Sequence, residues 1–365
     1  MHFDGVPVER VDAAVYTVRT ETPEQDGTFD WDRTTVLVVE VHAAGKTGLG
    51  YSYTCAAAAR VVTETLAPIL IDKDAFAIPS HWKAMLRSVR NFGSRGVCAN
   101  AIAAVDVALW DLKARLLDVP LAQLFGMIRA SVSIYGSGGF TNYTDQQLHE
   151  QLGGWTHVDG CCSVKMKIGR DARRDEERMR VARSAIGSAA LMIDANGAFD
   201  LKQSLATARR AQEFGVTWFE EPVSSDDLNG LRLLRDRVPA PIEIAAGEYG
   251  YDLFYFRRMI EAGAVDVIQA DATRCCGYTG FMAAAWLADS HPIPLSAHTA
   301  PALHLPVCCA APRLRHIEWF HDHVRLEAMM FDGVPKPKNG QIAPDLTRAG
   351  HGLRLKRDEV DQFKI

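Results

Sequence analysis

Several features that would indicate other kinds of protein are missing from this chain of 365 residues. No apolar run reaches the roughly 18 residues that suggest a membrane-spanning helix, so we expect no membrane partner. The segment Met1–Gly5 has neither the basic nor the apolar region of a signal peptide, and we therefore expect a cytoplasmic protein. The formal net charge of −5 gives no overall field that attracts nucleic acid.

Common motifs for zinc, dinucleotide and hydrolase chemistry are also absent. The eight cysteines form no CxxC pair, so zinc and thioredoxin-like functions are disfavoured and we expect most cysteines to be buried. The segment Gly136–Gly139 lacks the GxGxxG spacing that an open Rossmann-type sheet needs after its first strand. No serine stands at a nucleophile elbow, which disfavours a hydrolase triad.

The first part of the chain predicts a small α+β unit at residues 1–126. Strands are expected at Val8–Val18 and Thr34–Val41, and a turn then leads to Gly48–Tyr51. Helices are expected at Ala56–Pro68, Ser80–Val89 and Val97–Leu117. By composition alone, the polar segment Thr20–Trp31 between the first two strands is interpreted as a surface loop.

From Val132 onward, short apolar runs alternate with amphipathic stretches such as Asp175–Ala185 and Leu201–Phe214. The predicted strands are Val132–Tyr135, Ser163–Ile168, Leu191–Ile193, Val216–Phe219, Ile242–Ala246, Val265–Gln269, Ile293–Ser296 and Arg315–Trp319. Eight such repeats favour an α/β fold of the TIM-like (β/α)8 barrel type. We predict this barrel at 127–331, with 332–365 packing back on the first unit as part of a capping domain.

Polar residues lie at or just beyond the ends of seven consecutive predicted strands. They are Lys167, Asp194, Glu220, Glu248, Asp271, His298 and Glu318, spaced 20 to 28 residues apart. Singly, each has a simple structural explanation such as a helix N-cap. Together they predict a site, because barrel enzymes place their chemistry at the carboxyl ends of the strands.

Three carboxylates on neighbouring strands, Asp194, Glu220 and Glu248, form a hard, oxygen-rich ligand set. This set favours Mg²⁺, with Mn²⁺ as a substitute and calcium as an alternative. Strand alternation puts Lys165 and Lys167 on one side, where a cation and a second ammonium group would lower a lysine pKa.

A second catalytic pair is expected on the following strands. Asp271 could hold the tautomer of His298 and stabilise its charge, which suits an acid or a base. The role of Arg274 stays open between a second substrate carboxylate and a structural contact.

The sequence closely resembles the mandelate racemase subgroup of the enolase superfamily over essentially its whole length. The resemblance rests on Ala101–Leu112 with Pro120 and Gly126, on Lys165–Met166–Lys167, Asp194–Ala195–Asn196–Gly197, Phe219–Glu220–Glu221–Pro222 and Gly247–Glu248, and on Asp271 and His298. Cys275 and Cys276 depart from the glycine that relatives often carry.

The resemblance implies roles for these residues. Asp194, Glu220 and Glu248 would bind Mg²⁺; Lys167 and the His298–Asp271 pair would act on opposite faces of the substrate; Lys165, Asn196 and Glu318 would contact it, with Glu318 donating a hydrogen bond. Thr20–Trp31 and Gly50–Thr54 would be loops that close over the site. The resemblance also implies a homo-oligomer.

The chemistry that the resemblance implies is removal of the proton next to a carboxylate, which enolase-like sites share. We expect a lyase that dehydrates an acid sugar, an aldonate or aldarate, to a 2-keto-3-deoxy acid. A racemase or epimerase of an α-hydroxy acid uses the same residues and is the alternative. A metal-binding barrel without catalysis is the third hypothesis.

Overall fold

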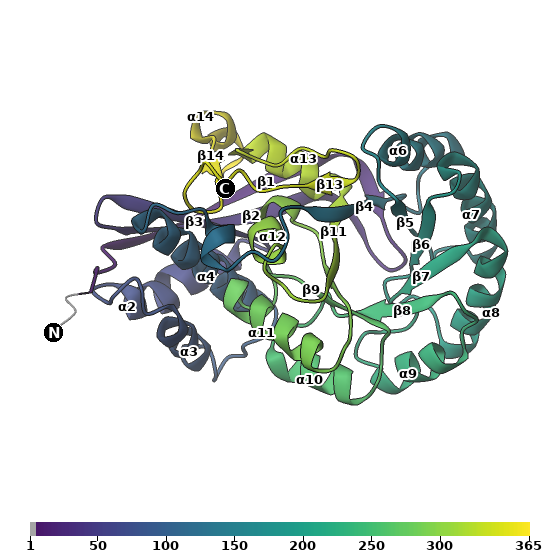
Figure 1. The fold of residues 1–365 in the computed structure, drawn as a ribbon, viewed down its shortest axis with the longest axis horizontal. Helices are drawn as coiled ribbons and strands as arrows, with labels where there is room; N and C mark the ends of the chain where they lie inside the picture. Colours follow the sequence, from purple (N-terminus) through teal and green to yellow (C-terminus); the bar gives the residue numbers. More distant parts are fainter. Residues whose placement is uncertain (1–4) are drawn as a thin grey trace.

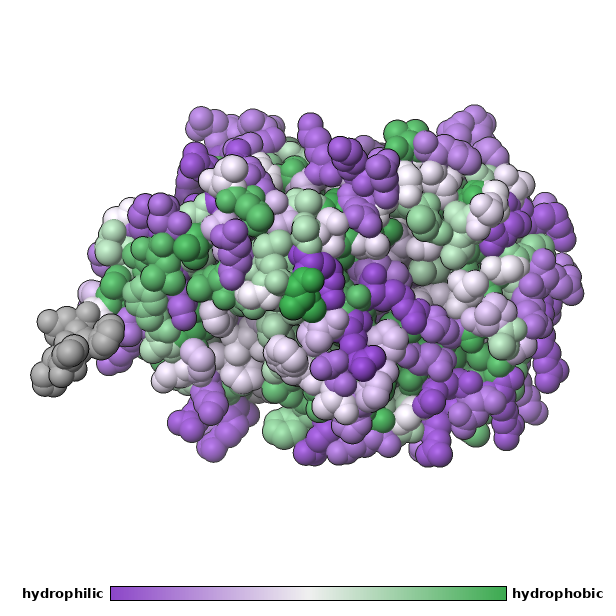
Figure 2. All heavy atoms as spheres, viewed as in Figure 1, coloured by the Kyte–Doolittle hydropathy of each residue, from purple (hydrophilic) through white to green (hydrophobic). Residues whose placement is uncertain are grey.

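The computed structural model describes residues 5–365; Met1–Asp4, which entered the expectation of a cytoplasmic protein, lie outside the described residues. Figure 1 shows a barrel on the right and a smaller sheet with helices on the left. Figure 2 shows mostly polar side chains over the barrel helices and apolar side chains gathered over the smaller part. Within 5–365, no helix is both long and apolar enough to cross a membrane.

The barrel predicted from the sequence is confirmed. Its strands are β4 (Val132–Gly138), β5 (Ser163–Lys167), β6 (Ala190–Asp194), β7 (Val216–Glu220), β8 (Glu243–Ala246), β9 (Val267–Ala270), β10 (Leu295–Ala297) and β11 (Leu314–Phe320). The helices between and after them are α6 (Asp145–His157), α7 (Ala172–Ile186), α8 (Leu201–Ala211) with η2 (Gln212–Phe214), α9 (Leu228–Arg237), α10 (Leu253–Glu261), α11 (Gly277–Ser290), α12 (Pro301–Cys308) and α13 (His321–Met330). Neighbouring strands are parallel, and β11 pairs with β4 to close the barrel.

Strand β4 extends three residues beyond its predicted end at Tyr135, through the glycine-rich segment to Gly138. A side chain on Gly136 would collide with the indole of Trp155, which packs there from α6. The glycines therefore serve close helix-to-strand packing inside a strand and do not mark a loop.

The smaller part is an antiparallel sheet covered by helices. Strands β1 (Arg10–Gln25), β2 (Asp30–Ala43) and β3 (Lys46–Tyr53) are followed by α1 (Ala57–Arg60), the π-helical η1 (Val61–Leu66), α2 (Ala67–Leu70), α3 (Ile78–Ser88), α4 (Val97–Leu116) and α5 (Leu121–Leu124). The single helix expected at Ala56–Pro68 is thus three successive pieces. Helix α4 approaches β3 so closely that side chains at Gly48 and Gly50 would meet its backbone.

The prediction that Thr20–Trp31 is a loop was wrong for most of its length. Strand β1 continues to Gln25 and β2 begins at Asp30, so only the tip of the hairpin turns. Side-chain pairing explains the extension, because the Trp31 indole donates to Glu24 Oε2 at 2.8 Å across the two strands. Composition did not show this contact, since it depends on strand register.

The hairpin tip reaches the barrel. Thr141 N donates to the Gln25 carbonyl at 2.8 Å, and Arg170 Nε donates to the Asp26 carbonyl at 2.9 Å. Figure 1 shows the β1–β2 hairpin extending toward the ends of the barrel strands. The smaller part therefore covers one end of the barrel.

The last segment contacts both parts. It contains β12 (Phe331–Asp332), β13 (Gln341–Ile342), β14 (Arg354–Leu355), α14 (Arg357–Val360) and η3 (Asp361–Phe363). Strand β13 pairs with β4 of the barrel, whereas Ile365 N donates to the Val15 carbonyl in β1 at 3.0 Å. The division into domains at 126 and 331 stays a prediction.

Gly27→Ala should loosen the hairpin tip. The added methyl would meet the carbonyl oxygens of Ala195 and Ile168, which belong to the barrel and cannot move far. We expect amide hydrogen exchange over 24–31 to accelerate about tenfold or more, measured by mass spectrometry. Gly154→Ala in α6, where the new methyl has open space, is the control. Unchanged protection over the tip would contradict this close packing.

Glu327→Gln should remove a pH dependence of stability. Burial raises the pKa of Glu327 to about 8, although the hydrogen bond from the Tyr51 hydroxyl opposes this. The folded state then keeps a proton that the unfolded chain releases from about pH 4.5, so the free energy of unfolding falls as pH rises toward 8. The loss should be on the order of 4 kcal/mol.

In the Glu327→Gln variant the side-chain amide can still accept from Ala302 N and donate to the Tyr51 oxygen, so the fold should persist. Urea unfolding at pH 5 and pH 8 measures the difference. The exposed Glu150→Gln is the control. An equal pH slope in the wild type and Glu327→Gln would show that Glu327 is not the source.

Candidate functional site

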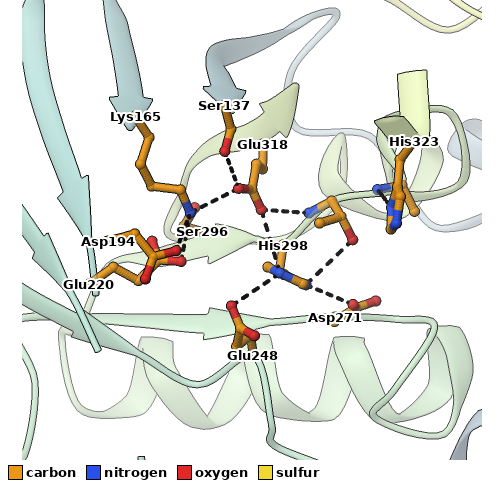
Figure 3. Close-up of polar contacts among 12 residues, drawn as sticks. Ser137, Lys165, Asp194, Glu220, Glu248, Asp271, Ser296, His298, Glu318 and His323 are labelled. Carbon is orange, nitrogen blue, oxygen red and sulfur yellow. Dashed lines mark hydrogen bonds and ion pairs between the residues drawn. The ribbon is translucent and has the colours of Figure 1, made fainter. Parts of the chain in front are cut away.

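The polar residues predicted at the strand ends meet at one end of the barrel. Lys165, Lys167, Asp194, Glu220, Glu248, Asp271, His298 and Glu318 are each at most 6% exposed. Figure 3 shows Lys165, Asp194, Glu220, Glu248, His298 and Glu318 directed toward one another from different strands or from the residues that follow them. A cavity of about 250 Å³ opens above them; its lining includes Lys167, Asn196, Glu248, Arg274, His298 and Glu318. The expected convergence is therefore present.

Three carboxylates lie close enough to share one cation. Asp194, Glu220 and Glu248 each offer one oxygen, and these atoms all lie within 4.8 Å of one another. An all-oxygen set of this size suits a hard divalent cation such as Mg²⁺, which keeps other positions for water or substrate. The residues present thus fit the metal that the sequence predicts.

Two lysines stand beside these carboxylates. Lys165 Nζ donates to Glu220 Oε1 at 2.6 Å, and Lys167 Nζ donates to Asp194 Oδ2 at 2.5 Å. Burial opposes the charge of both lysines, but nearby carboxylates, Glu220 first for Lys165 and Asp194 for Lys167, raise their pKa values. The carboxylates acting alone thus shift the lysine pKa upward, opposite to the effect that a bound cation would have.

His298 and Asp271 form the expected pair. The His298 Nδ1 lies 2.8 Å from Asp271 Oδ2, while Asp271 Oδ1 accepts from Thr273 N at 2.7 Å. Burial opposes the charge of His298, but Glu248 and other carboxylates raise its pKa to about 10. The imidazole is therefore fixed in orientation, with Nε2 directed toward the cavity and 3.1 Å from Glu248 Oε2.

Glu318 is surrounded by donors. Its Oε1 accepts from Ser137 Oγ at 2.6 Å and lies 2.8 Å from Lys165 Nζ, and its Oε2 accepts from Thr299 N at 3.0 Å. Burial opposes ionisation, but Lys165 and other cations lower the pKa of Glu318 to about 2. These contacts favour a carboxylate, whereas the hydrogen-bond donation implied by the resemblance needs the protonated acid; that role stays a prediction.

The backbone around the site is held in unusual conformations. Asn196, Glu221, Thr299 and Ala300 all have positive φ although none is glycine. Each follows a strand end, where such strain is tolerated because surrounding contacts fix the chain. At Asn196, with φ of 47°, the N–H turns back to Asp194 Oδ1 at 2.9 Å.

Arg274 points at the site but is already engaged. Its Nη1 lies 3.2 Å from both the carbonyl and Oε1 of Glu248, and its guanidinium lies over the Tyr249 ring at 4.9 Å. Of the two roles that the sequence left open for this arginine, these contacts support the structural one.

Several residues near the site had not been singled out in the sequence. Ser137 contacts Glu318, the Trp218 indole donates to Glu220 Oε2 at 2.9 Å, and His323 stacks on Tyr53 with ring centroids 3.4 Å apart. Trp218 could have been found, because residues two apart in a strand share a face. The sequence around His323 gave no indication of this contact, because its partner Tyr53 lies in β3, far away along the chain.

The expectation that Gly50–Thr54 is a loop was wrong, because Gly50–Tyr53 belongs to β3, but the segment does reach the barrel. Ser52 Oγ donates to the Thr273 carbonyl at 2.7 Å, directly after β9. Only the hairpin is shown to line the cavity, through residues that include Thr28, Phe29 and Trp31.

The chain is similar to characterised acid-sugar enzymes. It is 31% identical over 369 residues to a 3,6-anhydro-alpha-L-galactonate cycloisomerase of Streptomyces coelicolor, covering 98% of this chain and 99% of that one. It is 30% identical over 309 residues to the L-talarate/galactarate dehydratase of Salmonella typhimurium, covering 82% and 77% of the two chains.

Solved structures share the whole fold. A crystal structure of that dehydratase with Mg and L-lyxarohydroxamate has a TM-score of 0.90 at 26% identity, covering 99% of this chain and 94% of that chain. A mandelate racemase/muconate lactonizing enzyme-like protein from Rubrobacter xylanophilus has a TM-score of 0.96 at 48% identity, with 98% and 100% covered.

Two family descriptions together match most of the sequence. Residues 10–126 match the N-terminal domain of mandelate racemase and muconate lactonizing enzyme, and residues 147–359 match the enolase C-terminal domain-like family. With the closed barrel and the buried carboxylates, these matches confirm the resemblance: the chain belongs to the mandelate racemase subgroup of the enolase superfamily.

Proposed function

We propose that this protein is a Mg²⁺-dependent enzyme that removes the α-proton of an acid sugar and then eliminates water, forming a 2-keto-3-deoxy acid. One observation carries the proposal: a buried cluster of three carboxylates lies beside a cavity whose lining includes Glu248 of that cluster, Lys167 and His298. Relatives named as acid-sugar dehydratase and cycloisomerase support the substrate class.

Asp194, Glu220 and Glu248 would hold the metal. Bound there, Mg²⁺ supplies a positive charge that stabilises the enediolate formed when the α-proton leaves. Lys165 would lie near the substrate carboxylate, Asn196 would contact the substrate, and Glu318 would donate to a carboxylate oxygen in its protonated form. Asn196 Oδ1 is buried without a hydrogen-bond partner in the described structure, so this oxygen could accept a hydrogen bond from a substrate hydroxyl.

Lys167 and His298 would act from different walls of the cavity. Lys167 extends from β5, whereas His298 follows β10, and both line the space that a substrate would fill. Lys167 takes the α-proton in this proposal. His298, held by Asp271, protonates the leaving hydroxide, because its Nε2 faces the cavity.

A second outcome of the same proton removal has specific support. The relative matched over 98% of this chain is named an anhydro-galactonate cycloisomerase. In a 3,6-anhydro sugar acid, the group on the carbon next to the α-carbon is an ether oxygen, and its elimination opens a ring without releasing water. Both reactions need the same base and differ in the leaving group that His298 would protonate.

Incubation with Mg²⁺ and a panel of acid sugars in D₂O tests the proposal. The panel contains aldonates, aldarates and 3,6-anhydro-galactonates, followed by NMR and by detection of keto acids. A keto-deoxy acid from an aldonate or aldarate supports dehydration, and one from an anhydro acid indicates ring opening. Deuterium at the α-carbon without elimination indicates a racemase or epimerase. Neither turnover nor exchange would favour the non-catalytic barrel.

Lys167→Ala should abolish α-proton exchange on one face of the substrate. Loss of a positioned general base removes about 10²-fold or more of the rate, on the order expected for proton-transfer catalysis. Mg²⁺ affinity, measured by calorimetry, should be retained because the carboxylates remain. The exposed Lys202→Ala is the control. Exchange at the wild-type rate would rule out Lys167 as the base.

Glu220→Gln should weaken Mg²⁺ binding by about 100-fold or more, since loss of a direct ligand should cost at least what loss of an outer contact does. Calorimetric titration of the full chain gives the dissociation constant. The exposed Glu213→Gln should match the wild type. An unchanged constant in Glu220→Gln would place the metal elsewhere.

A further inference from the structure

His323 lines the cavity at a distance from the three-carboxylate cluster. It lies in α13, which follows β11, whereas the cluster residues stand at or just after the ends of β6, β7 and β8. In the strand order of the closed barrel, β11 lies across from β7. Figure 3 shows Glu318 and His298 between Lys165 and His323. His323 therefore borders a part of the cavity that is remote from the cluster.

Two aromatic rings and one backbone amide fix the His323 ring. Tyr53 of β3 stacks on it with ring centroids 3.4 Å apart, and Phe320 meets it edge-on at 5.1 Å. Ala300 N donates to His323 Nδ1 at 3.4 Å. Because an amide nitrogen only donates, Nδ1 carries the lone pair, and the uncharged imidazole has its proton on Nε2. Within residues 5–365, Nε2 has no hydrogen-bond partner.

The His323 ring is an uncharged donor at neutral pH. Burial lowers the pKa of His323 to about 3, and the nearby His298 adds to this effect. One N–H of an uncharged imidazole suits a hydroxyl or ether oxygen. It compensates a buried carboxylate much less than an ammonium or guanidinium group would.

The β1–β2 hairpin brings no cation to the cavity. Its residues in the described lining are Asp26, Thr28, Phe29, Trp31 and Thr34, of which only Asp26 is charged. Asp26 Oδ1 accepts from Thr28 N and Phe29 N, both at 2.6 Å. The nearby Arg170 bonds only the carbonyl of Asp26, and its guanidinium pairs with Asp30 Oδ2 at 2.8 Å. The smaller part thus presents a carboxylate to the cavity.

The cations of the described lining all stand at the cluster end. They are Lys167, Arg274 and His298, and each contacts a carboxylate of the cluster at 2.5 to 3.2 Å. These cations are already balanced by carboxylates of the barrel. A second carboxylate at the other end of a substrate would therefore find no free counter-ion there and would meet the charge of Asp26.

We propose that His323 donates from Nε2 to an uncharged oxygen in the part of the substrate remote from the cluster, and that the cavity prefers acids with one carboxylate over aldarates. The preferred acids are aldonates and their 3,6-anhydro forms. The inference rests on the proposed function and narrows its substrate class. An aldonate ends in a hydroxymethyl group, whereas an aldarate carries a second carboxylate, which is costly to bury beside Asp26 without a counter-ion.

Matched pairs of acids test this preference. Each pair shares the configuration of an acid that is turned over in the D₂O panel and differs only in the terminal group, for example galactonate with galactarate. We expect kcat/KM to favour the aldonate by about tenfold or more, since an unpaired like charge costs several kcal/mol. Equal or higher values for the aldarate would overturn the inference. Turnover of no acid in the panel would instead contradict the proposed function.

Binding gives a second measure that does not depend on turnover. The Lys167→Ala chain loaded with Mg²⁺ should leave the ligand intact, so calorimetry can compare the two acids of each pair. Tighter binding of the aldonate supports the preference. Tighter binding of the aldarate, or equal binding, contradicts it.

Asp26→Asn should weaken the discrimination, because it removes the charge while the amide oxygen can still accept from Thr28 N and Phe29 N. The ratio of kcat/KM for aldonate over aldarate should fall about threefold or more. Asp32→Asn is the matched control, since Asp32 lies on the same hairpin outside the described lining. An unchanged ratio in Asp26→Asn would remove Asp26 from this role.

His323→Phe keeps a ring to stack on Tyr53 and removes both nitrogens. We expect KM for the aldonate to rise about fivefold or more with a smaller change in kcat, because a bond to an unreacting oxygen is made equally in ground and transition states. His323→Gln should recover part of the loss, since its amide can donate. His149→Phe on the exposed face of α6 is the control. A fall in kcat alone, with no rescue, would indicate a merely structural role.

A crystal structure of the wild-type chain with Mg²⁺ and an unreactive aldonohydroxamate decides the contact without any variant. A ligand oxygen within about 3.2 Å of His323 Nε2 supports the inference. A ligand that leaves Nε2 without an acceptor at hydrogen-bond distance would show that His323 does not bind the substrate.

Discussion

The burial of many charges at one end of a barrel constrains the whole structure. A buried carboxylate is costly unless a cation or hydrogen-bond donors compensate it, and Asp194, Glu220 and Glu318 all lie within reach of Lys165. Such compensation requires that strands far apart in the sequence end at the same level. The pairing of β11 with β4 closes the barrel, so the carboxyl ends of all its parallel strands lie in one ring, the rim.

The smaller part of the chain packs against this end of the barrel. The hairpin tip contacts barrel loops through Gln25 and Asp26, and Ser52 binds the backbone after β9. The cavity lining therefore comes from both parts of the chain, whereas Lys167, Glu248 and His298 in that lining belong to the barrel.

Much of this arrangement could be predicted from the sequence. Seven polar residues after successive apolar runs indicated the rim, and the spacing of Lys165 and Lys167 placed both on one face. The hairpin at 20–31 was interpreted wrongly because strand pairing across Glu24 and Trp31 is a contact between side chains, which composition does not contain. The same limit applies to the stacking of His323 on Tyr53.

The sequence by itself determined the fold class and the identities of the charged groups, because both follow from local patterns that repeat along the chain. Only the tertiary structure decided which oxygen of each carboxylate faces inward. That choice depends on donors such as Trp218, which shares a face of its strand with Glu220, and Asn196, whose N–H is turned by a positive φ. A sequence specifies which groups are present, but the direction of a hydrogen bond exists only after the chain has folded.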